Sequence, residues 1–197
     1  VPGLSFGHLS RCLILAKELK KSCDSETIFL MRDYPEGILH AESSGCAVRT
    51  LIPSLQKSAH DGIVKEHISN IKPDWLVVDL PDDDPNFYLD YARQHCILTV
   101  CIDDTAERGY RSEVILNSSI LADRNAYGEC LPNTRFLIGA DYFIMEDYII
   151  KRHQTINGES VSVLITFGGS DLTGLTVKVV CALSKITWKG VNFTLIL

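Results

Sequence analysis

Short apolar segments alternate with amphipathic helical segments along almost the whole chain, and this alternation restricts the fold more than any other feature. The apolar segments have the length of β-strands and are rich in Val, Ile and Leu, and in the segments between them apolar residues recur at helical spacing. This pattern is typical of an α/β fold in which helices cover both faces of a parallel sheet. Strands are predicted at 27–31, 47–52, 74–80, 97–103, 114–119, 135–139, 162–167 and 192–197, those at 74–80 and 97–103 being buried, and helices at 8–21, 35–45, 57–71, 84–95 and 173–186.

The polar segment KRHQTINGES (151–160) interrupts this alternation and is predicted to link two domains. Residues 1–150 would then form one α/β domain, and residues 159–197 would form the opening β-α-β unit of a second. An α/β domain of this kind begins with a strand, which would precede Gly3. We expect the first domain to lack that strand.

The composition excludes several classes of function. The net charge is −6 and the sequence has no basic run, which argues against a nucleic-acid partner. Its apolar runs are too short to cross a bilayer, so no transmembrane segment is predicted. The seven cysteines show no Cys-x-x-Cys pair and no spacing typical of metal ligands. They are interpreted as reduced, mostly buried thiols of a cytoplasmic protein.

The segment TFGGSDLTG (166–174) is a candidate phosphate-binding loop, because it follows a predicted strand and precedes a predicted helix. Ligands of open parallel sheets bind at the carboxyl ends of the strands. Gly168 and Gly169 would let backbone amides approach an anion, and the helix N-terminus would add positive potential. The hydroxyl of Ser170 could bind a phosphate oxygen. A tight turn between strand and helix explains the same residues, and the spacing leaves both interpretations open.

His8 is a candidate general base at the start of the first helix. The helix dipole disfavours the charged imidazolium there, and a base must be neutral. Gly7 would leave space for substrate, and Arg11, about one turn later, could bind an anion or pair with an acid. A histidine that merely caps the helix, with a solvated arginine, is the alternative.

Several polar residues follow predicted strands. Asp79 ends one strand, Asp103 and Asp104 end the next, and Asn117 lies near the end of a third. Together with the acidic run 82–84, these carboxylates could bind a hard cation, although such a run is more often a solvated loop and a helix cap. The predicted site contains no metal and no cofactor.

Taken together and in this order, five segments resemble the UDP-sugar hydrolases of pseudaminic acid biosynthesis and the related spore-coat polysaccharide biosynthesis proteins. The segments are FGHLSRCLILAKEL, VVD, VCIDDTAERGYRSEVILN, FLIGADYFIMEDY and VLITFGGSDLTGLTVKVVCAL, and they extend from Gly3 to about Leu183. The resemblance implies the two-domain glycosyltransferase-B architecture, with a Rossmann-like parallel sheet in the first domain and the start of a second α/β domain. It also implies that a UDP-sugar binds between the domains and is cleaved at the anomeric carbon without a metal, releasing UDP.

Carried over by position, His8 matches the family's catalytic histidine, and Gly168, Gly169 and Ser170 match its diphosphate loop. Asp103, Asp104 and Asn117 match family positions without a defined role. The chain departs from the family at three places. Ser5 replaces a glycine, Pro81 stands where the family has a tyrosine, and Glu146 stands where it has an arginine.

Three functions therefore remain in view. The first is hydrolysis of a UDP-linked deoxy-diacetamido sugar for nonulosonic acid or surface polysaccharide biosynthesis. The second is transfer of the sugar to an acceptor hydroxyl by a glycosyltransferase. The third is a subunit that binds a nucleotide sugar without turnover. In each case a UDP-sugar is the expected partner.

Overall fold

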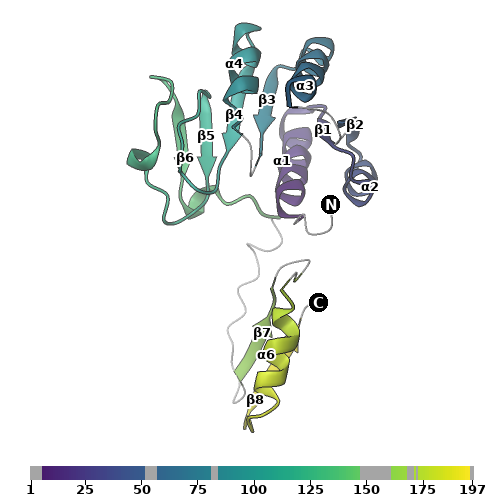
Figure 1. Cartoon of the computed structure of the whole chain (residues 1–197), viewed down its shortest axis with the longest axis vertical. Coiled ribbons are helices and arrows are strands. Elements are labelled where there is room, and N and C mark those ends of the chain that lie inside the picture. Colours follow the sequence, from purple (N-terminus) through teal and green to yellow (C-terminus); the bar gives the residue numbers. More distant parts are fainter. Residues whose placement is uncertain are drawn as a thin grey trace. The chain divides into compact units, whose positions relative to one another are not determined.

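The computed structural model describes residues 6–51, 57–80, 84–146, 161–167, 171 and 173–195 (Figure 1). The chain falls into two compact units, one formed by Arg11–Met145 and the other by Val1–Ser10 together with Glu146–Leu197. The boundary near the N-terminus lies inside helix α1 (Gly7–Cys23). The predicted linker 151–160 lies outside the described residues, so the predicted division into 1–150 and 159–197 stays a prediction.

The larger unit alternates strands and helices as predicted from the apolar pattern, and every strand pair in it is parallel. The predicted α/β class is therefore confirmed, with element ends within a few residues of those expected. After α1, its elements are β1 (Ile28–Arg32), α2 (Pro35–Ser43), β2 (Ala47–Leu51), α3 (Lys57–Ile71), β3 (Trp75–Val78), α4 (Asn86–Gln94), β4 (Leu98–Ile102), β5 (Val114–Asn117), the 3-10 turn η1 (Arg124–Ala126), β6 (Arg135–Ile138) and the 3-10 turn η2 (Ala140–Tyr142).

The strands of this unit lie in two sheets. One contains β1 and β2, and the other has the order β3-β4-β5-β6. Among the described residues, no strand pairing joins β1 to β3.

The exposure of β3 differs from the prediction that 74–80 is a buried strand. Val78 is buried, but Trp75 is 53% exposed and Val77 is 37% exposed. Both exposed residues lie on one face, because successive side chains of a strand alternate between faces. This partial exposure follows from the position of β3 at the edge of its sheet. The unit has two clusters of buried apolar residues: one contains Val78 together with Leu89, Cys101 and Ile115, and the other lies around Ile68 and Ala92.

The cysteines are all free, in agreement with the prediction of thiols rather than a disulfide set. The prediction that most of them are buried is wrong, because Cys101 is the buried one and three others are exposed. Cys23 is the last residue of α1 and Cys96 is the second residue after α4, so both lie at helix ends and are exposed. No helix in the described part of the chain has the length and apolar character needed to cross a membrane.

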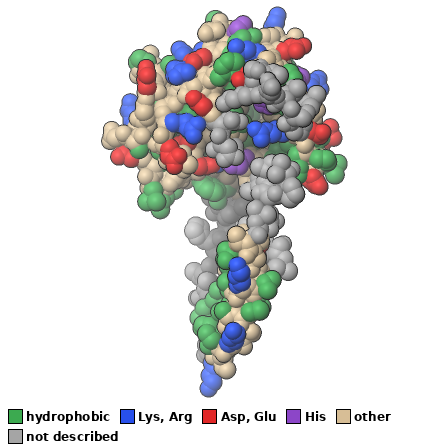
Figure 2. All heavy atoms as spheres, in the orientation of Figure 1, with side chains coloured by type: hydrophobic (Ala, Val, Ile, Leu, Met, Phe, Trp, Pro, Cys, Tyr) green, Lys and Arg blue, Asp and Glu red, His purple; other side chains and the backbone are tan. Residues whose placement is uncertain are grey.

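The smaller unit contains a β-α-β motif, as predicted for 159–197. Strand β7 (Val161–Ile165) pairs in parallel with β8 (Val191–Leu195), and helix α6 (Leu175–Leu183) connects them. Figure 2 shows hydrophobic side chains on the surface of this motif. The most exposed of them are Val161, Leu164 and Val177, at 60%, 61% and 65%.

Gly109 lies in the loop after β4, where two chain segments approach closely. A Cβ atom on Gly109 would lie 2.1 Å from the carbonyl oxygen of Glu129. Gly62→Ala in helix α3 is the control. It makes the same chemical change, but a Cβ atom on Gly62 would meet open space. We expect Gly109→Ala to lower the free energy of unfolding by about 1–3 kcal/mol through overpacking. Gly62→Ala should raise it by up to about 1 kcal/mol, because alanine favours helix. Urea titrations of both variants, followed by circular dichroism, measure this difference in sign.

Candidate functional site

Several of the polar residues that follow predicted strands lie at one edge of a sheet. Asp79 follows β3, and Asp103 and Asp104 follow β4, the adjacent parallel strand. The carboxyl ends of parallel neighbours lie on the same side of a sheet, and ligands of open α/β sheets bind on that side. This edge of the β3-β4-β5-β6 sheet is therefore the candidate site of the larger unit.

Arg11 of α1 is bound by carboxylates from both strand ends. Its Nε and Nη2 donate to the two oxygens of Asp79 at 2.6 Å each. Its Nη1 and Nη2 donate to the two oxygens of Asp104 at 2.7 and 2.9 Å. Of the two roles left open for Arg11, anion binding or pairing with an acid, the structure shows pairing with acids. We call Arg11, Asp79 and Asp104 the arginine clamp.

The two arms of the arginine clamp differ in burial. The Asp79 side chain is 6% exposed, whereas that of Asp104 is 50% exposed. Burial lowers the pKa of the Arg11 guanidinium, but the hydrogen bonds to both carboxylates outweigh it, so its pKa is raised. Burial and the charge of Asp79 raise the pKa of the neighbouring Cys12 thiol to about 12. Cys12 therefore stays protonated and donates to Asp79 over 3.4 Å.

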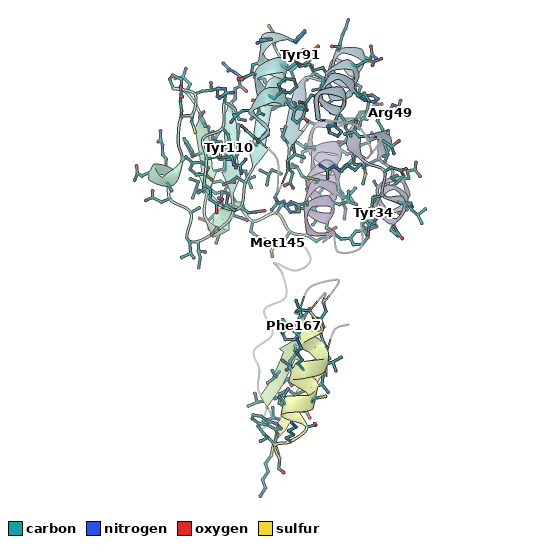
Figure 3. The ribbon with its side chains drawn as sticks, viewed as in Figure 1. Tyr34, Arg49, Tyr91, Tyr110, Met145 and Phe167 are labelled. Carbon is teal, nitrogen blue, oxygen red and sulfur yellow. The ribbon has the colours of Figure 1, made fainter. Side chains whose placement is uncertain are left out.

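Asp103 lies in a second, buried network beneath this edge. Its Oδ1 accepts a hydrogen bond from the hydroxyl of Tyr110 at 2.6 Å, and Tyr110 is labelled in Figure 3. Its Oδ2 accepts from the Ala106 amide, from Asn117 Nδ2 and from the Tyr127 hydroxyl, at 2.8, 2.9 and 2.9 Å. These four donors, together with the Thr105 hydroxyl, which donates to Oδ1 over 3.4 Å, hold the loop after β4 against β5 and the segment around Tyr127.

These contacts explain the charge states in the network. Burial raises the pKa of the Asp103 carboxyl, but the hydrogen bonds from Tyr110, Ala106 and Tyr127 lower it more, and the net pKa is depressed. Burial and the bond to Asp103 raise the pKa of Tyr110, which stays a donor. Asn117 is fully buried, and its Oδ1 accepts from the Ser119 amide. Asp103 and Asn117 thus connect the segments that form this edge of the sheet. A contact of either residue with substrate stays a prediction.

The described acidic residues do not form a metal centre. Across the described ranges, no group of three or more potential ligands among His, Cys, Asp and Glu lies together. The carboxylates of Asp79 and Asp104 both bind the Arg11 guanidinium, which supplies the positive charge between them. Asp84 accepts from the Asn86 amide at the start of α4, as a capping residue does. Positions 82 and 83 of the acidic run lie outside the described residues.

Gly7 and His8 form the first turn of α1. Gly7 is the first residue of the helix and is exposed, and His8 is half-buried. His8 and Arg11 are three positions apart, so both lie on the same side of the helix. The role of His8 as a base, and that of Gly7 in leaving space for substrate, stay predictions.

The predicted phosphate loop 166–174 is described only in part, at 166–167, 171 and 173–174. Gly168, Gly169 and Ser170 lie outside the described residues, so their role stays a prediction. The structure adds Asp171, whose Oδ1 and Oδ2 accept from the amides of Leu175 and Thr176 at 2.8 Å each. The Asp171 carboxylate therefore binds the first amides of α6. In the phosphate-loop interpretation of the sequence, the positive potential of this helix N-terminus acts on a phosphate.

Asp171→Asn tests whether this carboxylate competes with a bound phosphate. Asparagine caps helices about as well as aspartate, so α6 should be retained. Removal of the negative charge should raise the affinity for UDP by about two- to fivefold, the effect of one charge at a helix terminus. Calorimetry with UDP measures the change, and Asp141→Asn, an exposed acid in η2, is the control. Weaker binding by Asp171→Asn would show that the carboxylate supports the loop instead.

Sequence reasoning missed Tyr110, Tyr127 and Asp171. The two tyrosines carry no local signal, because they reach Asp103 through tertiary folding across 7 and 24 positions. Asp171 did have a signal, since an acid a few residues before a predicted helix is a candidate cap.

Comparison with known proteins places the fold but assigns no activity. No protein-family model matches the chain. An uncharacterized protein of Methanocaldococcus jannaschii, MJ1062, is 30% identical over 188 residues, which cover 89% of this chain and 36% of that protein. The chain thus spans about a third of the length of this curated relative. The relative's name gives no support for a UDP-sugar hydrolase family.

Among solved structures, MurG of Acinetobacter baumannii matches with a TM-score of 0.61 and 11% sequence identity. The match covers 96% of this chain and 62% of MurG. MurG is a glycosyltransferase of the GT-B fold. The GT-B-type architecture expected from the sequence is therefore confirmed, while the low identity restricts this comparison to the fold.

Proposed function

We propose that this chain is part of an enzyme of the glycosyltransferase type that uses a UDP-sugar as donor and transfers the sugar to an acceptor hydroxyl. The observation that carries this proposal is the GT-B-type fold, shared with MurG over 96% of the chain. The polar site at the carboxyl ends of β3 and β4 supports it, because α/β sheets of this kind bind their ligands there.

In this proposal the half-exposed carboxylate of Asp104 faces the sugar or the acceptor. Both of its oxygens accept hydrogen bonds from Arg11, and a carboxylate has further acceptor sites for hydroxyl groups. His8 acts as the base that removes the proton of the attacking hydroxyl, a step that a neutral imidazole can perform. The loop 168–170 binds the diphosphate through backbone amides.

Water could take the place of the acceptor, and the enzyme would then be a hydrolase, as the resemblance to the pseudaminic acid enzymes implies. The fold supports the transferase more directly, because its solved relative MurG is one. A subunit that binds UDP-sugar without turnover is the remaining alternative.

The deciding experiment incubates the protein, at its natural length, with a panel of UDP-sugars and follows UDP and free sugar together. UDP release that depends on an added acceptor, without free sugar, supports the transferase. Equal amounts of UDP and free sugar identify the hydrolase. Saturable binding of a UDP-sugar without UDP release identifies a binding subunit, and absence of binding to every UDP-sugar contradicts the proposal as a whole.

A further inference from the structure

We propose that Arg11 is a positioning residue: the arginine clamp fixes the N-terminal part of α1, and through it the first turn that carries His8. This inference rests on the proposed function for its catalytic consequence. Its structural part concerns only α1 and the ends of β3 and β4.

The geometry of the arginine clamp suits this role. One guanidinium binds two carboxylates through paired hydrogen bonds of 2.6–2.9 Å, so its plane is set by two independent partners. Paired bonds between arginine and carboxylate constrain orientation as well as distance. The thiol of Cys12, the residue after Arg11 in α1, also donates a hydrogen bond to Asp79. Two adjacent residues of the helix are therefore bound to one strand end.

The packing of α1 shows why its N-terminal part needs such contacts. The buried residues of α1 are Leu13 and Ala16, both on the C-terminal side of Arg11. The first turn contains no acidic residue to compensate the positive end of the helix dipole. Asp79 and Asp104 supply negative charge close to that end. Apolar packing thus holds the middle of α1, and the arginine clamp holds its beginning.

Asp104 depends in turn on the network of Asp103. Asp103 binds the amide of Ala106 and the hydroxyl of Tyr110, which fixes the loop that carries Asp104. The chain of contacts therefore runs from the buried network through Asp104 to Arg11 and α1. The step from Asp103 to Asp104 is the peptide chain itself, and the step from Asp104 to Arg11 is a pair of hydrogen bonds.

A matched control exists in the same unit. Arg111 binds Asp90 through Nε and Nη2 at 2.8 and 2.6 Å, the same type of paired contact. These side chains are 41% and 35% exposed, and the pair connects the loop after β4 to α4 rather than to α1. Replacing Arg111 therefore measures the effect of losing an arginine–aspartate contact that does not involve α1.

The test compares Arg11→Lys with Arg111→Lys. Lysine keeps the positive charge but cannot form paired bonds with a carboxylate. The first readout is the imidazole signal of His8 in the NMR spectrum of the histidines, assigned by its loss in His8→Gln. We expect Arg11→Lys to shift or broaden this signal and Arg111→Lys to leave it unchanged. Because charge is conserved, such a change reports geometry. A His8 signal identical to wild type in folded Arg11→Lys would overturn the proposal.

The second readout is the rate of UDP release. Misplacement of a catalytic group should lower kcat about 10- to 100-fold in Arg11→Lys, with KM nearly unchanged. Asp79→Asn, altered at the buried arm, should lower kcat in the same way and serves if Arg11→Lys does not fold, with Asp90→Asn as its control. A wild-type kcat in folded Asp79→Asn would contradict the proposal. If the wild-type protein releases no UDP, the proposed function fails, and the NMR comparison still decides whether Arg11 positions the first turn.

Discussion

Replacing His8 by asparagine is expected to lower the rate of UDP release by about 10²- to 10⁴-fold, the usual contribution of a general base. Asparagine is a good residue for a helix start, so α1 should keep its first turn. Affinity for UDP should stay close to wild type, because the diphosphate is assigned to the loop 168–170. A steady-state assay of UDP release, with calorimetry of UDP binding, measures both quantities.

His95→Asn is the matched control for this substitution. His95 is an exposed histidine directly after α4, where its Nδ1 lies 2.8 Å from the Tyr91 carbonyl oxygen. Its replacement should leave UDP release unchanged. Near wild-type UDP release by His8→Asn would reject the catalytic role and leave His8 as a structural cap.

Asp103→Asn is expected to lower the free energy of unfolding by about 2–4 kcal/mol, since hydrogen bonds to a charged group contribute about 1.5–3 kcal/mol each. An asparagine side chain has one carbonyl oxygen for donors that now bind two carboxylate oxygens. The Tyr110 hydroxyl can reverse its direction and accept from the new amide. The Ala106 amide, Asn117 Nδ2 and the Tyr127 hydroxyl can still share one oxygen, as they share Oδ2 in the wild type, but that oxygen no longer carries the negative charge that strengthens their hydrogen bonds.

The same substitution should change the pH dependence of stability. The pKa of Asp103 is lowered in the folded protein, so its contribution is fully present above the carboxyl pKa of an unfolded chain, about 3.9. That contribution is lost as the pH falls through the lower pKa of the folded state. Wild type should therefore lose more stability on acidification than Asp103→Asn does.

Urea titrations between neutral and acidic pH measure this difference. Asp123→Asn is the control, because Asp123 is an exposed acid whose carboxylate accepts a hydrogen bond from the Asn125 amide at the start of η1. Its change should stay below about 1 kcal/mol, since asparagine caps equally well. Equal stability of Asp103→Asn and wild type at neutral pH would show that the network contributes little to folding.

The sequence alone determined the elements and their class. Apolar periodicity is a property of neighbouring residues, and it located β4, α4 and the β-α-β motif of the smaller unit without tertiary information. It also placed Asp79 and Asp104 at the ends of predicted strands, and the carboxyl ends of parallel neighbours lie on one side of a sheet. Local pattern suffices for such conclusions because hydrogen bonding within helices and along strands repeats at fixed spacing.

Tertiary structure decided which of these groups bind one another. Arg11 meets Asp79 and Asp104 across 68 and 93 positions, a pairing that no spacing in the sequence encodes. It likewise decided that Asp103 is directed into a buried network while its neighbour Asp104 stays half-exposed, because successive residues after a strand point to different surroundings. The physical reason is that charge pairing and burial depend on distances between remote segments, which are set only when the sheet and its helices have packed.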